Sequence, residues 1–266
     1  MNLRHAGATE THKKWRLTVG TVALSASLLT GLMSATSMAA TIADPSDPAV
    51  QAAIQRTFDG TWSQADIDLI QSNPELAAKL PDPRRAPTTV IKQADLNEDG
   101  QPVDAANGQP LSPAEAADFE PSSTADSTLL DREVLPAETD SAQPTGIAPR
   151  ITGGTWRKTH VIRTHYSYLG DVIYKYHHWA EFNYGGGKVR AWRYRADDTT
   201  NAVDWVEPRE RQINQVTSAN QTLSATSYMK RKMAHCVITN IACSYTYPWV
   251  KTKVYGNGSV TFTTGS

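Results

Sequence analysis

The residues best able to move a proton lie close together in the C-terminal half of the chain. His177 and His178 are adjacent. Glu181 and Arg193 follow within the next sixteen positions. An imidazole titrates near neutral pH and can act as a general acid or base, while a carboxylate can orient it and a guanidinium can bind an anion. The candidate catalytic residues are therefore His177, His178, Glu181 and Arg193.

The same region carries aromatic and basic residues that are more typical of ligand binding than of catalysis. A tryptophan on a rigid strand can stack on a sugar ring or a base, and nearby cations can contact phosphate or other anionic groups. A basic run at positions 230–232 adds charge. The candidate ligand-binding residues are Trp179, Trp192, Arg190, Arg195, Lys230, Arg231 and Lys232.

Strand alternation predicts which of these side chains share a face. Successive side chains of a strand point to opposite sides, and the even-numbered positions of 174–184 are the more apolar. We expect that side to face the core and Trp179 to be exposed on the other. The same rule puts Arg193 and Arg195 on one face of the returning strand. The plain alternative is an ordinary solvent-facing surface with cross-strand Glu–Arg pairs.

The only two cysteines, Cys236 and Cys243, predict a disulfide. A metal site is the weaker interpretation, because one neighbouring histidine, His235, supplies too few ligands. We expect no metal and no cofactor.

The N-terminus predicts export. Basic residues between Arg4 and Arg16 precede an uncharged, mildly apolar stretch at 17–33, and Ser37-Met38-Ala39 fits a signal peptidase site. We expect a signal peptide over 1–40 and an extracellular protein. A membrane anchor is the alternative, but the stretch is shorter than the ~20 apolar residues of a span. We expect no integral membrane segment after processing.

Charge divides the remaining chain. Residues 41–150 carry 7 basic and 19 acidic side chains, whereas residues 151–266 carry 15 and 7. Capping signals predict short helices over 41–80. The acidic, proline-rich stretch 81–150 shows no apolar period and is predicted to be a disordered linker or propeptide. A processing protease could cut after Arg150 or at Arg84-Arg85.

The sequence pattern of residues 151–266 predicts strands. This region is rich in β-branched and aromatic residues, with turn signals at short intervals such as the Asn257-Gly258 pair. The pattern predicts an all-β domain of seven or eight antiparallel strands, either a β-sandwich or a small barrel.

The chain resembles small secreted pre-pro proteins of actinobacteria. The resemblance covers the order of its parts (export signal, acidic segment, basic domain) and the general sequence character of residues 61–83 and 171–195. The resemblance implies a propeptide that is removed during maturation. It carries no catalytic motif, so it assigns no residue a role.

Three functions stay open at this point. The first is a secreted binding protein for a cell-surface glycan or polyanion, such as a cell-wall glycan or anionic polymer. The second is a secreted hydrolase or toxin, nuclease-like, with an acidic propeptide. The third is a protein-interaction or inhibitor domain. Whether the protein is an enzyme is left undecided by the sequence.

Overall fold

The computed structural model describes residues 42–120, 153–201, 203–238 and 242–266, all within one compact unit that spans 40–266. The predicted signal peptide and the predicted processing position after Arg150 lie outside the described residues. In the described part, no helix is long and apolar enough to cross a membrane.

Three short helices open the described chain, as predicted. Each begins where a side chain caps it: Asp47, Ser63 and Asn73 accept hydrogen bonds from backbone N–H groups of the first turns. The helices are α1 (Pro48–Phe58), α2 (Gln64–Gln71) and α3 (Pro74–Lys79).

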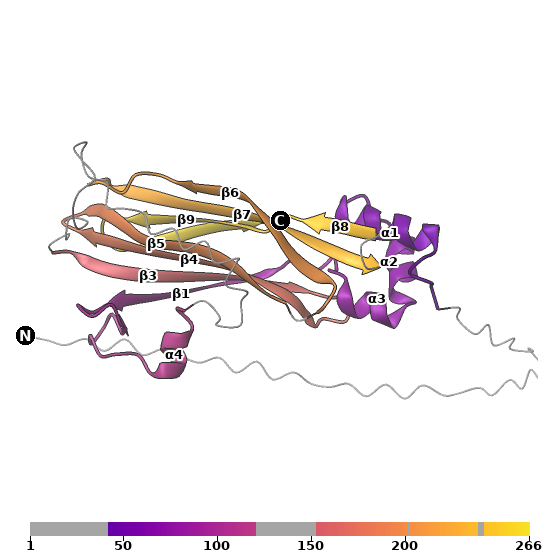
Figure 1. Cartoon of the computed structure of the whole chain (residues 1–266), viewed down its shortest axis with the longest axis horizontal. Coiled ribbons are helices and arrows are strands. Elements are labelled where there is room, and N and C mark those ends of the chain that lie inside the picture. The colour runs from indigo at the N-terminus through magenta and orange to yellow at the C-terminus, as the bar shows by residue number, and fades with distance from the viewer. Residues whose placement is uncertain (1–41, 121–152, 202, 239–241) are drawn as a thin grey trace, which may run out of the picture. The chain divides into compact units, whose positions relative to one another are not determined.

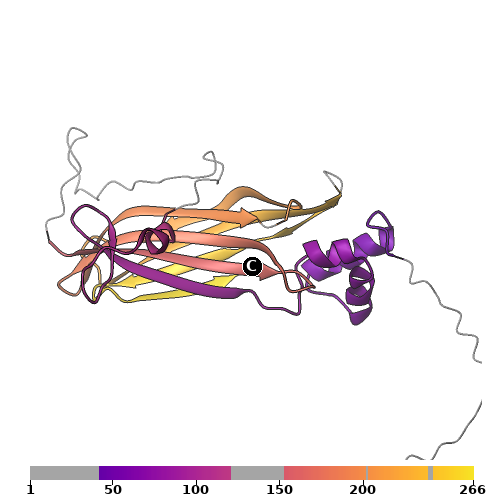
Figure 2. The same ribbon diagram turned by 90° about the horizontal axis from the view of Figure 1, so that it is seen from below.

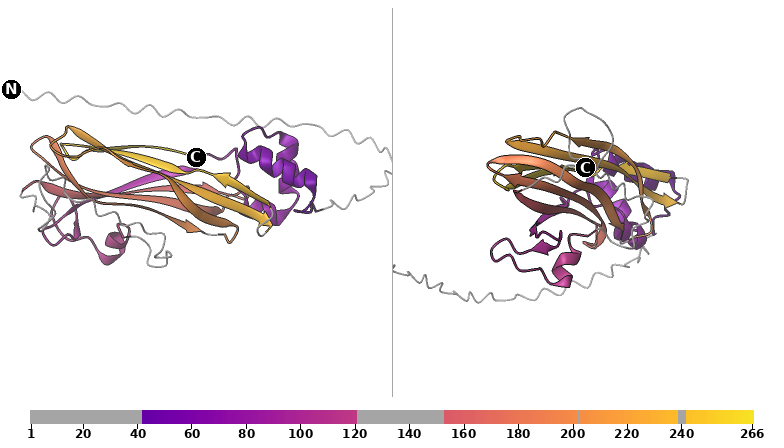
Figure 3. Two further views of the ribbon diagram at one scale, coloured as in Figure 1. Left: turned by 45° about the horizontal axis from the view of Figure 1, so that its top comes forward. Right: turned by 60° about the vertical axis from the view of Figure 1, so that its left-hand side comes forward.

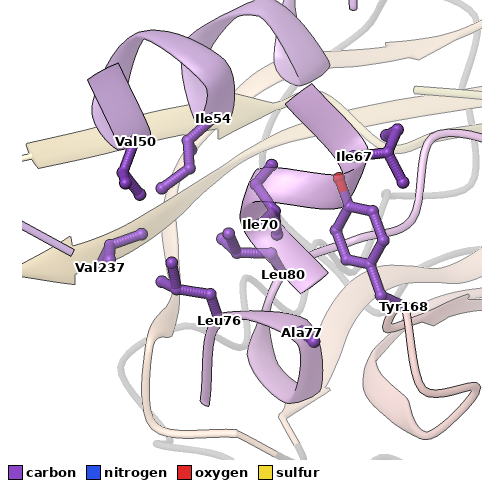
Figure 4. Packing of buried hydrophobic residues seen from close by; sticks show 9 residues of the cluster. All are labelled: Val50, Ile54, Ile67, Ile70, Leu76, Ala77, Leu80, Tyr168 and Val237. Carbon is purple, nitrogen blue, oxygen red and sulfur yellow. The ribbon is translucent and has the colours of Figure 1, made fainter. Parts of the chain in front are cut away.

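The helices do not form a module of their own. Their apolar residues share one core cluster with Tyr168 and Val237, which belong to the strand region (Figure 4). The helices therefore close one end of the strands, as two views show (Figures 1 and 2).

The strands form two antiparallel sheets, which confirms the predicted sandwich. The first sheet has the order β2-β1-β3-β4-β5. Its strands are β1 (Thr88–Leu96), β2 (Pro102–Val103), β3 (Thr155–Tyr166), β4 (Val172–Gly185) and β5 (Lys188–Asn201).

The second sheet has the order β10-β9-β7-β6, with β8 paired beside β7 (Figure 1). Its strands are β6 (Val206–Val216), β7 (Ser224–Ile238), β8 (Ala242–Thr246), β9 (Trp249–Tyr255) and β10 (Val260–Gly265). The predicted disulfide is present and joins Cys236 of β7 to Cys243 of β8.

The prediction of disorder over 81–150 is wrong for residues 81–120. Strand β1 pairs with β3 along its whole length, from Thr88 opposite Thr164 to Leu96 opposite Trp156. Further along, helix α4 (Pro113–Ala117) lies over the outer face of the first sheet (Figures 1 and 2). The pairing was not predicted because β1 gains its order from backbone bonds to a strand far away in the chain, which leave little trace in local composition.

The two sheets pack face to face (Figure 3). Apolar side chains and a polar network fill the space between them. As predicted, the even-numbered side chains of β4 point inward: Tyr174 and Tyr176 pack on Met233, and Phe182 packs on Val254. Among them lies Asp197, which is fully buried. Its carboxylate forms ion pairs with the guanidinium groups of Arg211 and Arg231.

Candidate functional site

The register of the first sheet lines up its outward side chains in rows that run across β1, β3, β4 and β5. Three neighbouring rows contain two of the residues that the sequence singled out, His177 and Trp179. The rows are Thr88, Thr164, Lys175 and Thr200; Val90, Ile162, His177 and Asp198; and Lys92, His160, Trp179 and Ala196.

Two histidines and a tryptophan form one buried cluster on this face. His160 Nε2 lies 2.8 Å from His177 Nδ1, and His177 Nε2 lies 2.7 Å from the Thr200 hydroxyl. Both imidazoles stack on the indole of Trp179. Burial lowers the pKa of His160 to about 3 and that of His177 to about 4. Both rings are therefore neutral at pH 7.

The other predicted catalytic residues have partners elsewhere. Glu181 shares the outer face with His177 but forms an ion pair with Arg193, whose guanidinium also lies over Trp156. His178 points into the space between the sheets, where it hydrogen-bonds Ser227 Oγ (2.9 Å) and Thr252 Oγ1 (3.2 Å). The structure thus brings three of the four onto one face, without a hydrogen bond between His177 and Glu181.

The prediction that Trp179 and Trp192 stack on a ligand fails because neither ring has an exposed face. Trp179 is 2% exposed and packs with Tyr194 and Ala196. Trp192 is 6% exposed on the inner side, and its Nε1 donates to the Thr217 carbonyl at 3.0 Å. Sheet-face alternation could not reveal that residues 113–120 cover the outer face.

A β-bulge puts two arginines that were expected to share one face on opposite faces of β5. Glu181 pairs with Tyr194 and Phe182 with Trp192, so Arg193 is the extra residue between them. Arg195 consequently points inward, is 1% exposed and donates to Ser227 Oγ and Asn214 Oδ1. It cannot contact an external anion.

The remaining predicted ligand-binding residues have different environments. Arg190 is half-buried at the start of β5. Arg231 is buried and paired with Asp197, so it is not part of a surface run. Lys230 and Lys232, its neighbours on β7, point to the opposite side and are partly exposed.

Those two lysines belong to a surface that we call the lysine–tyrosine face. It is the outer face of the second sheet, made by the outward residues of β7 and β9 with the tyrosines beside them. Tyr228 pairs with Lys251 and Lys230 with Trp249 across the strands. Its members are Tyr228, Lys230, Lys232, Tyr245, Tyr247, Trp249, Lys251, Lys253 and Tyr255.

Ammonium groups on this face lie over aromatic rings. Lys230 Nζ is 5.1 Å from the ring centroid of Tyr247, and Lys232 Nζ is 4.1 Å from that of Tyr245. Strands β7 to β10 contain no aspartate or glutamate. Glu210 of the neighbouring strand β6 lies 3.7 Å from Lys232. The face is therefore positive.

Sequence reasoning missed Lys251 and Lys253. The signal was present, because a Lys-x-Lys pair in a strand with buried residues between puts both charges on one face. The face also adjoins a pocket of about 400 Å³, which shares Tyr245 and Tyr247 and includes Tyr166, Arg85 and the buried ring of His165.

Within the described ranges, no three or more His, Cys, Asp or Glu side chains are grouped so as to hold a metal ion. No protein-family model matches the chain, and neither a curated protein nor a solved structure shows significant similarity to it.

Proposed function

We propose that the protein is a secreted β-sandwich binding protein whose lysine–tyrosine face binds an anionic glycan or related polymer of a cell surface. The observation that supports this most is the set of four lysines, Lys230, Lys232, Lys251 and Lys253, on adjacent strands without an acidic residue in β7 to β10. Secretion is the part of the proposal that rests on the N-terminal sequence alone.

A polymer suits this face better than a small anion does. The lysines lie in successive rows of one sheet, so their charges are spread along a line rather than gathered around a point. Point charges on flexible stems bind repeated anionic groups without strict geometry, and their binding weakens as salt screens it. The tyrosine-lined pocket beside the face supplies rings on which a sugar can stack.

The hydrolase alternative has less support. A nuclease-type mechanism needs a histidine that carries a proton near neutral pH. Burial lowers the pKa of His177 to about 4 and that of His178 to about 3, and the carboxylate of Glu181 is engaged by Arg193. His177 packs on Trp179 in the first sheet, and His178 hydrogen-bonds side chains of the second sheet.

The proposal is tested by binding of the protein to immobilised dextran sulfate, with uncharged dextran as the reference polymer. Replacing both Lys251 and Lys253 by glutamine should weaken binding by about 2 kcal/mol, or about 30-fold, since each lysine near an anionic surface contributes about 1 kcal/mol. Affinity should also fall steeply with added salt.

The matched control is the double variant Lys175→Gln with Lys188→Gln, which removes the same charge from the first sheet. It should bind nearly as well as the unaltered protein. Equal losses in both double variants would mean that net charge, not this face, governs binding. Binding to dextran sulfate that does not weaken as salt is added would rule out the anionic ligand.

A further inference from the structure

A second cavity lies under helix α4, on the outer face of the first sheet. Its volume is about 660 Å³, within the range of small-molecule sites. Side chains from the rows of the sheet form its floor, and Ala117, Asp118 and Glu120 line its other side. The floor residues used below are His160, His177, Trp179, Asp198 and Thr200.

The covering segment is held by specific contacts. Lys92 Nζ lies 2.5 Å from Asp118 Oδ2, and Lys158 Nζ lies 2.6 Å from Glu120 Oε1. Phe119, between these two acids, is buried. The carboxylates of the cover are therefore neutralised by lysines of the sheet, and the cavity is a built part of the fold.

Two residues that line the cavity carry polar groups without the partners that buried groups normally have. Trp179 Nε1 is buried and has no hydrogen-bond partner among the described residues. An indole N–H can only donate, and buried donors are nearly always paired. The carboxylate of Asp198, also buried, accepts a hydrogen bond from the Thr199 backbone and forms no ion pair in the described part of the chain.

The charge of the cavity limits what it can hold. With Asp118 and Glu120 paired, the remaining charges are the ammonium of Lys175, exposed at the edge of the cavity, and the carboxylate of Asp198. They cancel. His160 and His177 are neutral at pH 7 and contribute no charge. A ligand with a net charge gains little from such a site.

We propose that this cavity binds a neutral sugar. Hydroxyl groups fit the Trp179 indole N–H and the Asp198 carboxylate because each hydroxyl can both donate and accept. One accepts from Trp179 Nε1, and another donates to Asp198. The hydrogen-bonded chain from His160 through His177 to Thr200 fixes the rings that hold the indole in place. This site is separate from the lysine–tyrosine face and does not depend on the function proposed for that face.

The test follows the indole N–H signals in proton–nitrogen correlation spectra, with the Trp179 signal identified by its loss in Trp179→Phe. Glucose, galactose, N-acetylglucosamine and their β-1,4-linked disaccharides are titrated into the protein. Glycine betaine and inorganic phosphate serve as zwitterionic and anionic comparators. We expect a saturable shift of the Trp179 signal with at least one neutral sugar and none with the two comparators.

Variants then locate the ligand. Asp198→Asn should weaken the sugar at least tenfold, whereas Asp204→Asn, at an exposed acid, should change nothing. Lys175→Gln, at the edge of the cavity, should weaken it severalfold and keeps the test valid if Asp198→Asn does not fold. The proposal is overturned if no sugar shifts the Trp179 signal, if only betaine or phosphate does, or if the cavity variants bind as tightly as Asp204→Asn.

Discussion

The carboxylate of Asp197 sits between the sheets with the side chains of Arg211, Arg231 and Tyr176 around it. Arg231 donates to it through Nε (2.9 Å) and through a terminal nitrogen (3.0 Å), and the Tyr176 hydroxyl donates at 3.1 Å. These pairs lower the pKa of Asp197 despite its burial. At the scale of single residues, part of the positive charge of the strand region is therefore buried. A count of charged residues along the chain overstates the positive charge on the surface.

Asp197→Asn should destabilise the protein by about 3–5 kcal/mol, because it leaves two buried guanidinium groups without their anion. The neighbouring Asp198→Asn is the matched control. Burial raises the pKa of Asp198, so removing its charge should change the free energy of unfolding by less than about 1 kcal/mol. Urea unfolding of both variants measures this. Similar losses would contradict the role given to the ion cluster.

Three elements change what the residues present. The β-bulge in β5 turns Arg193 outward and Arg195 inward. Helix α4 and the residues after it cover Trp179. Strand β8 adds a short partner beside β7, held by the disulfide. The alternation of side chains along a strand does not predict any of these three arrangements.

Replacing Cys236 and Cys243 together by serine should lower the free energy of unfolding by about 2.5 kcal/mol, the chain-entropy estimate for so short a loop. The ring is small, so the effect should be moderate and the fold should remain. Thermal unfolding with and without reductant checks this. Reductant should lower the melting temperature of the unaltered protein and leave that of the double variant unchanged.

At the scale of the molecule, the region before residue 121 is part of the sandwich. Nine residue pairs join β1 to β3, and the three N-terminal helices share a core with Tyr168 and Val237. A propeptide that was removed together with residues 81–120 would take a strand out of the first sheet and uncover Val161 and Ile162 at its edge. Maturation by removal of residues 81–120 stays a prediction, and it would require the first sheet to lose β1.

A chain that begins at Gly153 should fail to unfold cooperatively, whereas a chain that begins at Thr41 should unfold in one transition. The shorter chain loses β1, α4 and the helices, and with them the apolar contacts that bury one end of the strands. Circular dichroism on heating compares the two. A sharp transition for the shorter chain at a similar temperature would show that the region 151–266 folds alone.

The sequence by itself determined the capped helices at Asp47, Ser63 and Asn73, the inward side of β4, the disulfide and the antiparallel all-β class. These depend on local rules: a cap bonds its own first turn, and side chains alternate along a strand. Tertiary structure decided the rest. Four features each depend on a partner elsewhere in the chain: the place of β1, the bulge at Arg193, the burial of Arg231 and the cover over Trp179. Local sequence patterns do not predict such partners.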